Sequence, residues 1–285
     1  MIFPMLMACG GASLETRVEE LRVMAIKPIP AEMTPEDSLK IEFLIPNPPQ
    51  NSAQFLYWTC TNLGDGCLEK EYTESTGEQW GQVQTIDNEN ILHQVDFELP
   101  PVITALLSQL PGNDPFGASL LWVLACEESR CPLIQDWEAG QPDLEAMNSP
   151  FELMETLPKK GTSLAFRPLI LSNRPESERI QHPILTFNGD ESPSLKGPEG
   201  SQTLPFTYEL NRLDESSDAL YYAYTTQGGF AMNDRYTTLL QSESGEFTAE
   251  WFGTEDLEKG TAQLMVILEN GEGGISFWTK EGIVQ

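Results

Sequence analysis

Basic residues are scarce in this chain relative to acidic ones. The sequence of 285 residues has 16 Lys and Arg against 44 Asp and Glu, which gives a formal net charge of −28. Nucleic-acid binding depends on Lys and Arg contacts to phosphate, so this composition argues against DNA or RNA as a partner. The same negative charge disfavours a surface that lies flat on anionic lipid, and it is most typical of a well-hydrated acidic exterior.

Long apolar runs and catalytic motifs are also missing. No stretch approaches the roughly 18 consecutive apolar residues of a membrane-spanning helix, so any membrane attachment has to come through lipid. The sequence has no G-x-S-x-G elbow, and Gly271–Gly274 lacks the spacing and the helix of a dinucleotide-binding loop. The two histidines, His93 and His182, lie in an alternating apolar strand and beside a polar stretch, without the neighbours of a catalytic triad. We therefore predict no catalytic residues and no cofactor.

The most informative residue is the cysteine nearest the N-terminus, Cys9. An aliphatic residue, Leu6, stands three positions before it and a small residue, Ala8, directly before it, while Gly10–Ser13 after it are small and uncharged. This run resembles the lipobox of bacterial lipoproteins, in which a peptidase cuts before the cysteine and the free cysteine carries the acyl chains. The resemblance implies that Cys9 is the lipidation site and the point of attachment to a lipid bilayer.

The residues before Cys9 fit a signal peptide only in part. Residues 1–8 are mostly apolar, but they are fewer than a secretory signal needs and contain no Lys or Arg. We interpret them as the remnant of a signal peptide whose start lies upstream of Met1, and residues 9–19 as a flexible tether. The alternative is a frayed apolar N-terminus with an unattached cysteine.

The other cysteines suggest disulfides. The chain has five cysteines, so lipidation of Cys9 leaves an even number. Two polar loops each begin and end with cysteine, so we favour the local pairs Cys60–Cys67 and Cys126–Cys131, while the two cross-paired connectivities remain open. A zinc site is the functional alternative, but the spacing of Cys60 and Cys67 is too long for C-x₂₋₄-C and no histidine lies near either pair.

Calcium is the other metal that the sequence could hold. Oxygen donors of the kind that calcium prefers gather at Asn62 and Asp65, at residues 87–90 and at residues 188–191. None of these stretches forms a D-x-[DN]-x-[DN]-G loop, and Asp, Asn and Gly are equally the residues of β-turns. We therefore predict no metal site and keep calcium binding as an alternative.

Hydrophobic periodicity predicts an all-β fold. Between residues 39 and 45 every second residue is apolar, as in a strand with one face on a core. Residues 119–125 are apolar on both faces, as expected for a central strand. Further strands are predicted at 21–27, 54–59, 91–99, 164–171, 183–188, 204–210, 219–225, 246–251, 262–268 and 275–279, with a hairpin turn at 270–274.

The predicted strands fall into two series. The polar stretch 172–182 has no apolar period, so we interpret it as a linker between a domain at 20–171, which carries insertions, and a domain at 183–285. The chain length suits about two domains. Strands of this length, separated by turn signals and with almost no helix, indicate two tandem Ig-like β-sandwich domains.

Several segments of both series resemble one group of proteins. Residues 21–26, 30–37 and 57–60, followed by 221–230 and 264–278, are similar to bacterial envelope lipoproteins with tandem Ig-like domains of the polycystic-kidney-disease type. The resemblance implies a fold and a location in the bacterial cell envelope, but no residue roles. The residue after Cys9 is Gly10 and not Asp, which by resemblance to lipoprotein sorting patterns favours the outer membrane. The protein would face the periplasm or the exterior. No Cys-Trp-Cys spacing is present, so an inter-sheet disulfide is not expected.

These observations favour a non-catalytic, lipid-anchored envelope protein that serves as a binding or structural module. Its partners would be the lipid bilayer, through acylated Cys9, and an unidentified envelope protein or glycan. The insertions around Trp80 and at 132–160 are the candidate recognition loops. One alternative is a secreted hydrolase or calcium-dependent carbohydrate-binding protein that uses these insertions. Another is an assembly subunit that polymerises through sheet edges.

Overall fold

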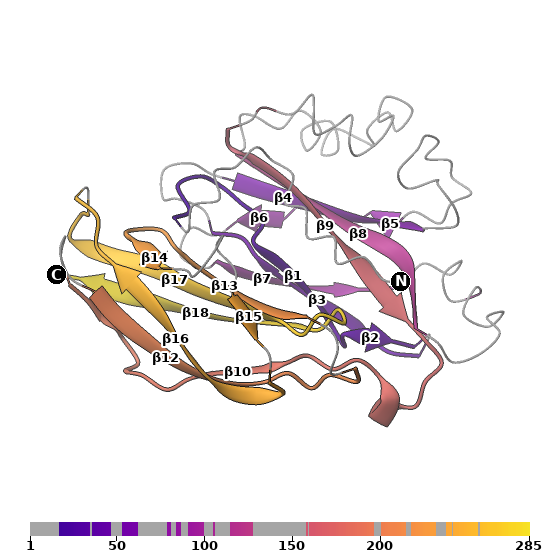
Figure 1. Cartoon of the computed structure of the whole chain (residues 1–285). Helices are drawn as coiled ribbons and strands as arrows, with labels where there is room; N and C mark the ends of the chain where they lie inside the picture. The colour runs from indigo at the N-terminus through magenta and orange to yellow at the C-terminus, as the bar shows by residue number, and fades with distance from the viewer. Residues whose placement is uncertain are drawn as a thin grey trace. The chain divides into compact units, whose positions relative to one another are not determined.

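The structure is a computed structural model with two compact units (Figure 1). Unit 1 contains Glu20–Arg179, and unit 2 contains Ile180–Gln285 together with residues 17–19. The boundary between Arg179 and Ile180 falls inside the stretch 172–182 that was interpreted as a linker. The structure describes residues 17–34, 36–46, 53–61, 79–80, 84–86, 91–99, 105, 115–127, 158, 160–196, 201–214, 218–231, 238–240, 242–255 and 257–285.

Unit 1 is a sandwich of two β-sheets. The smaller sheet has the order β1-β3-β7, with neighbouring strands antiparallel. The larger sheet has the order β2-β9-β8-β4-β5, and β6 also pairs with β4. The strands are β1 (Ala25–Ile29), β2 (Glu32–Met33), β3 (Leu39–Leu44), β4 (Ala53–Thr61), β5 (Gln79–Trp80), β6 (Gln84–Ile86), β7 (Leu92–Phe97), β8 (Phe116–Glu127) and β9 (Thr162–Leu171).

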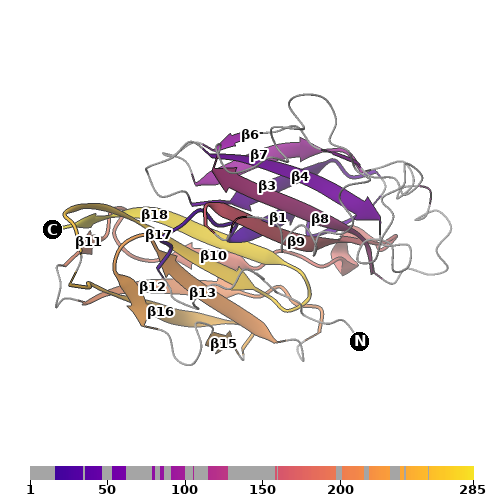
Figure 2. The ribbon, with the colours of Figure 1, turned by 90° about the horizontal axis from the view of Figure 1, so that it is seen from above.

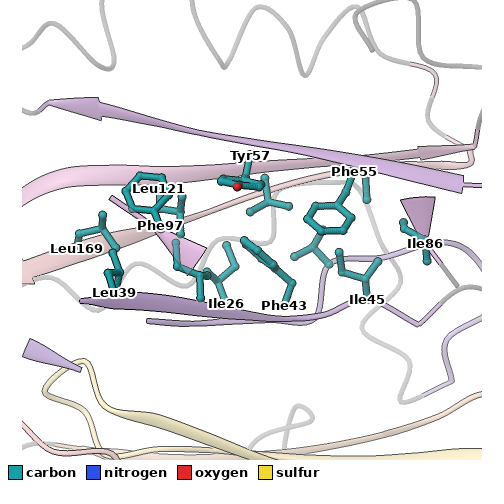
Figure 3. Close-up of a cluster of buried hydrophobic side chains, with 14 of the residues drawn as sticks. Ile26, Leu39, Phe43, Ile45, Phe55, Tyr57, Ile86, Phe97, Leu121 and Leu169 are labelled. Atoms are coloured by element: carbon teal, nitrogen blue, oxygen red, sulfur yellow. The ribbon is translucent and has the colours of Figure 1, made fainter. Parts of the chain in front are cut away.

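The core of unit 1 lies between its two sheets. Figure 3 shows Ile26 and Phe43 of the smaller sheet pointing toward Phe55, Tyr57 and Leu121 of the larger one. The ring centroid of Phe43 lies 5.2 Å from that of Phe55 and 5.6 Å from that of Tyr57. Removal of these large side chains from water supplies the main favourable contribution to folding of this unit.

The two central strands of the larger sheet are buried on both faces. Phe55 and Tyr57 of β4 face the core, whereas Trp58 faces the other way and is also fully buried. On that second face the ring of Trp58 stacks on Trp122 of β8, with centroids 6.2 Å apart, and Trp122 packs on Phe166 of β9. The apolar pattern of 119–125 is therefore confirmed as that of a central strand, since residues 121–125 are all buried.

Unit 2 is a second sandwich of two sheets. One sheet has the order β10-β12-β16-β14 and the other the order β11-β18-β17-β13-β15. Figure 1 shows β12 and β16 in one layer and β17 and β18 in the other. The strands are β10 (Ile184–Phe187), β11 (Ser194–Leu195), β12 (Ser201–Glu209), β13 (Ala219–Thr225), β14 (Gly229–Ala231), β15 (Thr238–Leu240), β16 (Ser244–Phe252), β17 (Gly260–Glu269) and β18 (Ile275–Val284).

The core of unit 2 is also rich in aromatic rings. Phe206 lies at its centre, with ring centroids 5.2 Å from Phe247, 5.1 Å from Trp278 and 5.3 Å from Phe187. Trp251 of β16 is fully buried, and its Nε1 donates a hydrogen bond of 2.9 Å to the carbonyl oxygen of Gln227. All the described residues of this core belong to unit 2.

A hairpin connects β17 to β18 at the predicted turn. The side-chain oxygen of buried Asn270 accepts hydrogen bonds from the backbone N–H groups of Glu272 and Gly274. Gly271 has a φ of +81°, and a Cβ atom there would lie 2.2 Å from the carbonyl oxygen of Asp218. The turn therefore needs glycine at this position, both for its backbone conformation and for space.

The strand order identifies both units as Ig-like β-sandwiches. In unit 2 the sheets β10-β12-β16-β14 and β18-β17-β13 reproduce the ABED and GFC order of an immunoglobulin domain. Unit 1 repeats the order with β1-β3-β7 and β9-β8-β4. In each unit a short strand also pairs in parallel with the last strand: β2 pairs with β9, and β11 pairs with β18, as Figure 2 shows. The predicted all-β, Ig-like fold class is confirmed.

The first strand differs slightly from its predicted bounds. Residues 21–27 were expected, but β1 runs from Ala25 to Ile29 and includes Pro28. β1 lies at the edge of its sheet and pairs with β3 alone, so the missing N–H of a proline can be tolerated there. Upstream, Val23 still donates its N–H to the hydroxyl of Ser163 and is buried, which explains the apolar pattern that precedes the strand.

Candidate functional site

Both histidines serve packing within their own units. The imidazole of His93 lies 5.5 Å, centroid to centroid, from the ring of Phe55, in the apolar strand where the sequence placed it. Nδ1 of His182 accepts a hydrogen bond of 3.1 Å from the backbone N–H of Ile275. Its carbonyl oxygen accepts another, of 2.9 Å, from the side chain of Asn211. Each histidine thus has contacts of a structural kind.

Of the cysteines, only Cys126 has a described side chain. It is fully buried on β8 and disulfide-bonded. The backbone of Cys60 belongs to β4, whereas Cys9, Cys67 and Cys131 lie outside the described part of the chain. Cys126 follows the core residue Ala125, so its side chain points away from the space between the sheets.

The register of β4 and β8 bears on the connectivity of the disulfides. Cys126 lies opposite Gln54, and Cys60 lies opposite Leu120, six positions along the same pair of strands. Six strand residues span about 20 Å, and a disulfide requires Cα atoms within about 7 Å. Cys60 and Cys126 are therefore not bonded to each other, which removes one of the three connectivities left open by the sequence.

Few of the candidate metal ligands and recognition loops lie in described segments. Asn188, Asp190 and Glu191 are exposed in the segment after β10. Among the described residues no three His, Cys, Asp or Glu side chains gather into a group that could hold a metal. Residues 62–65, 87–90 and most of 132–160 lie outside these residues, as does the side chain of Trp80. The prediction of no metal site stays a prediction.

A group of polar side chains in unit 1 surrounds Glu32. The carboxylate of Glu32 on β2 is fully buried and accepts hydrogen bonds from Nε of Arg174 at 3.0 Å and from Nη2 at 2.7 Å. The hydroxyl of Ser172, itself buried, donates to the same carboxylate. We name Glu32, Ser172 and Arg174 the Glu32 cluster. Such a forked pair satisfies a buried charge with good geometry.

A second ion pair lies next to the Glu32 cluster. Nη1 of Arg179 donates to Asp37 Oδ2 at 3.0 Å, and its Nε donates to the carbonyl oxygen of Arg174 at 2.9 Å. Asp37 Oδ2 also accepts the backbone N–H of Thr34 at 2.7 Å. The Glu32 cluster joins the chain after β9 to β2, and the Arg179–Asp37 pair joins it to the segment between β2 and β3.

The N-terminal segment is attached to unit 2. Arg17 forms an isolated parallel bridge with Thr225 at the end of β13, and the N–H of Val18 donates to the carbonyl oxygen of Thr225 at 2.7 Å. The side chain of Val18 is only 2% exposed. The folded part of unit 2 therefore begins within the stretch 9–19 that the sequence predicted as tether.

The sequence did not reveal the Glu32 cluster. Glu32 and Arg174 are separated by 142 positions, and the Ser-Asn-Arg composition after β9 is also that of an exposed linker. The sequence did contain one signal, which is that Glu32 is a single carboxylate between the apolar residues Ala31 and Met33. A single carboxylate among buried neighbours requires a cationic partner from elsewhere.

The described residues include no helix that is long and apolar enough to cross a membrane. No protein-family model and no curated protein match the chain. Among solved structures, Escherichia coli α2-macroglobulin activated by porcine elastase is similar at 9% identity over 94% of this chain and 22% of that one, with a TM-score of 0.28. The native conformation of the same protein gives 9% identity, 93% and 17% coverage and a TM-score of 0.27. The chain spans about a fifth of the length of these structures, and such low TM-scores imply no shared function.

Proposed function

We propose that the protein is a lipid-anchored, non-catalytic component of the bacterial cell envelope, in which two Ig-like domains form a binding or structural module. The observation that carries this proposal is the lipobox-like run Leu6-Met7-Ala8-Cys9 with the small residues Gly10–Ser13 behind it. Cleavage before Cys9 would free its amino group, which together with the side-chain thiol offers two positions for acyl chains. The acyl chains would then hold the protein at the bilayer.

The attachment of Val18 to unit 2 supports this proposal. Between Cys9 and Arg17 the chain advances by eight residues, which reach at most about 28 Å when fully extended. A tether of this length holds a folded domain close to the surface to which the lipid is anchored. The net charge of −28 keeps such a domain from lying flat on anionic lipid, so presentation above the membrane is favoured.

The cysteine count supports the same compartment. Cys126 is disulfide-bonded, and disulfides persist in oxidising compartments such as the periplasm and the cell surface. The preferred arrangement pairs Cys126 with Cys131 and Cys60 with Cys67, and it leaves Cys9 for the lipid. Because the residue after Cys9 is Gly10 and not Asp, the outer membrane is the favoured destination. The protein would face the periplasm or the exterior.

Metabolic labelling with palmitate tests the anchor. The full chain, expressed behind a complete secretory leader, should incorporate label and sediment with membranes, whereas Cys9→Ser should do neither. Ser13→Ala, which changes the tether but not the cysteine, should behave as the unaltered chain. Equal labelling of the chain with and without Cys9 would refute the lipid anchor.

The binding partner is the other part of the proposal. Crosslinking in intact envelopes, followed by affinity capture and mass spectrometry, should recover a defined envelope protein or glycan. Capture by the lipidated chain and loss with a variant that lacks residues 132–157 would assign the contact to that insertion. A glycan that binds in calcium and is released by a chelator would instead favour the carbohydrate-binding alternative.

A further inference from the structure

The stretch that connects the two units is bound to them along most of its length. Ser172 is buried beside β2, and its backbone N–H donates to the carbonyl oxygen of Met33 at 2.9 Å. Arg174 and Arg179 reach the carboxylates of Glu32 and Asp37. Between them Glu176–Glu178 form a single 3₁₀ turn, which orders the exposed part of the segment. We name Ser172–Arg179 the strap.

The chemistry of the Glu32 cluster makes release of the strap unfavourable. Glu32 is fully buried, so its carboxylate depends on protein groups in place of water. The guanidinium of Arg174 donates to it twice, and the hydroxyl of Ser172 donates once. If the strap leaves, these donors leave with it, and the buried carboxylate loses its pairing with Arg174.

The residues after the strap are bound to unit 2 by hydrogen bonds. Ile180 is 5% exposed, and the carbonyl oxygen of Gln181 accepts a hydrogen bond of 2.9 Å from the side chain of Asn270. His182 follows with its bonds to Ile275 and Asn211. The stretch 172–182 therefore contains polar residues, as the sequence showed, yet most of them are fixed to one unit or the other.

The equivalent position of unit 2 shows that the fold does not require this arrangement. There the N–H of Gln285 donates to the carbonyl oxygen of Leu195 at 3.1 Å, as Ser172 does to Met33 in unit 1. Ser194 precedes Leu195 on β11 as Glu32 precedes Met33 on β2, and Ser194 is exposed. The buried carboxylate is thus an addition to the Ig-like frame, and it occurs where the chain continues toward the other unit.

We infer that the strap acts as a lock. Its Arg174–Glu32 pair and, second, its Arg179–Asp37 pair hold the chain that connects the units in an ordered conformation. The connection is then not a flexible linker, because the residues on both sides of the Arg179–Ile180 bond are hydrogen-bonded. A connection fixed in this way resists proteases. The Glu32 cluster and the Arg179–Asp37 pair would set the threshold for its release.

Limited trypsin digestion of the full chain tests the lock. Trypsin cleaves poorly before proline, so Arg174–Pro175 is resistant and Arg179–Ile180 is the informative bond of the strap. The unaltered chain should be cut slowly there, because a protease needs locally released backbone. Glu32→Gln and Asp37→Asn should each raise the initial rate of that cut by at least about tenfold, since the rate follows the population of the released state.

Glu42→Gln is the matched control. Glu42 pairs with Lys27 at 3.3 Å, with side-chain exposures of 18% and 20% that resemble the 28% and 17% of Asp37 and Arg179, but the pair lies on β1 and β3. This variant should leave the cut within about twofold of the unaltered rate. Strap variants that are cut no faster than the control, or an unaltered chain that is cut there as readily as at an exposed loop, would overturn the lock.

Hydrogen exchange keeps the test decisive if Glu32→Gln does not fold. The N–H of Arg179 donates to the carbonyl oxygen of Glu176, and that of Arg174 to the hydroxyl of Ser172. In Asp37→Asn the exchange of these two amides should accelerate by at least about tenfold. Amides of β17 in unit 2 should not change. Uniform acceleration in both units, or no acceleration in the strap, would contradict the proposal.

Discussion

Unit 1 and unit 2 share one strand order, but they use charge differently. In each unit an arginine donates two hydrogen bonds to a glutamate, to both carboxylate oxygens of Glu32 in unit 1 and to Oε1 alone of Glu243 in unit 2. In unit 1 the carboxylate of Glu32 is fully buried and Arg174 is partly exposed, whereas in unit 2 Arg212 is 3% exposed and Glu243 is 41% exposed. In the first pair the fully buried partner is the carboxylate, whereas in the second it is the guanidinium, and the carboxylate of Glu243 keeps contact with water. The same interaction therefore has different weight in the two units.

The largest expected effect concerns the two cores. Phe43 in unit 1 and Phe206 in unit 2 are both buried, and each belongs to a core cluster that contains residues of its own unit alone. Phe43→Ala should lower the free energy of unfolding of unit 1 by about 3–5 kcal/mol, and Phe206→Ala that of unit 2 by a similar amount. Native-state hydrogen exchange should show loss of protection confined to the mutated unit. Equal loss in both units would mean that the cores unfold as one.

The next effect separates the two glutamates. Glu32→Gln should cost about 3 kcal/mol, because Arg174 donates to both oxygens of this fully buried carboxylate and the amide of Gln keeps only one acceptor. Glu243→Gln should cost less than about 1 kcal/mol, because both bonds from Arg212 go to Oε1, an acceptor that Gln retains, and the Glu243 side chain is 41% exposed. Urea denaturation of both variants measures the difference. Similar costs would remove the contrast between the units.

A smaller effect follows from the distribution of cysteines. Residues 180–285 contain no cysteine, so reduction should affect unit 1 alone. Loss of a Cys126–Cys131 bridge, which closes a short loop, should cost about 2 kcal/mol. Thermal unfolding with and without reductant measures the shift, and peptide mapping of the oxidised chain identifies the pairs. A peptide that joins Cys60 to Cys126 would contradict the strand register.

The smallest effect is a dependence on alkaline pH. Burial raises the pKa of the Tyr57 phenol above its ordinary value of 10.0, and the nearby negative charge of Asp96 raises it further. Native unit 1 therefore holds this proton more tightly than the unfolded chain does. Its contribution is complete below pH 10 and is lost as the pH rises through the native pKa. Tyr57→Phe should flatten the alkaline decline of the free energy of unfolding, and an unchanged decline would assign it to other groups.

Strands were more predictable from the sequence than the contacts that join distant segments. The alternation at 39–45 and the two-sided apolar run at 119–125 arise from neighbours in the chain, so a short window contains the information. The short strands β2, β11 and β14 have only two or three residues each and gave no periodic signal. The partners of Glu32 lie on a stretch whose composition also suits a linker, so only the folded register brings them together. Of the candidate sites, Cys9 and most of the insertions lie outside the described residues, and their roles stay predictions.

The bridge between Arg17 and Thr225 has a consequence for the order of folding. The two residues are about 200 positions apart, so the contact closes a loop that contains all of unit 1. During synthesis the N-terminal segment emerges first, yet its acceptor on β13 emerges only after unit 1 is complete. We expect this contact to form late, after β13 has paired with β17. Any chaperone or membrane enzyme that engages the N-terminus before then would meet Arg17 and Val18 in an undocked state.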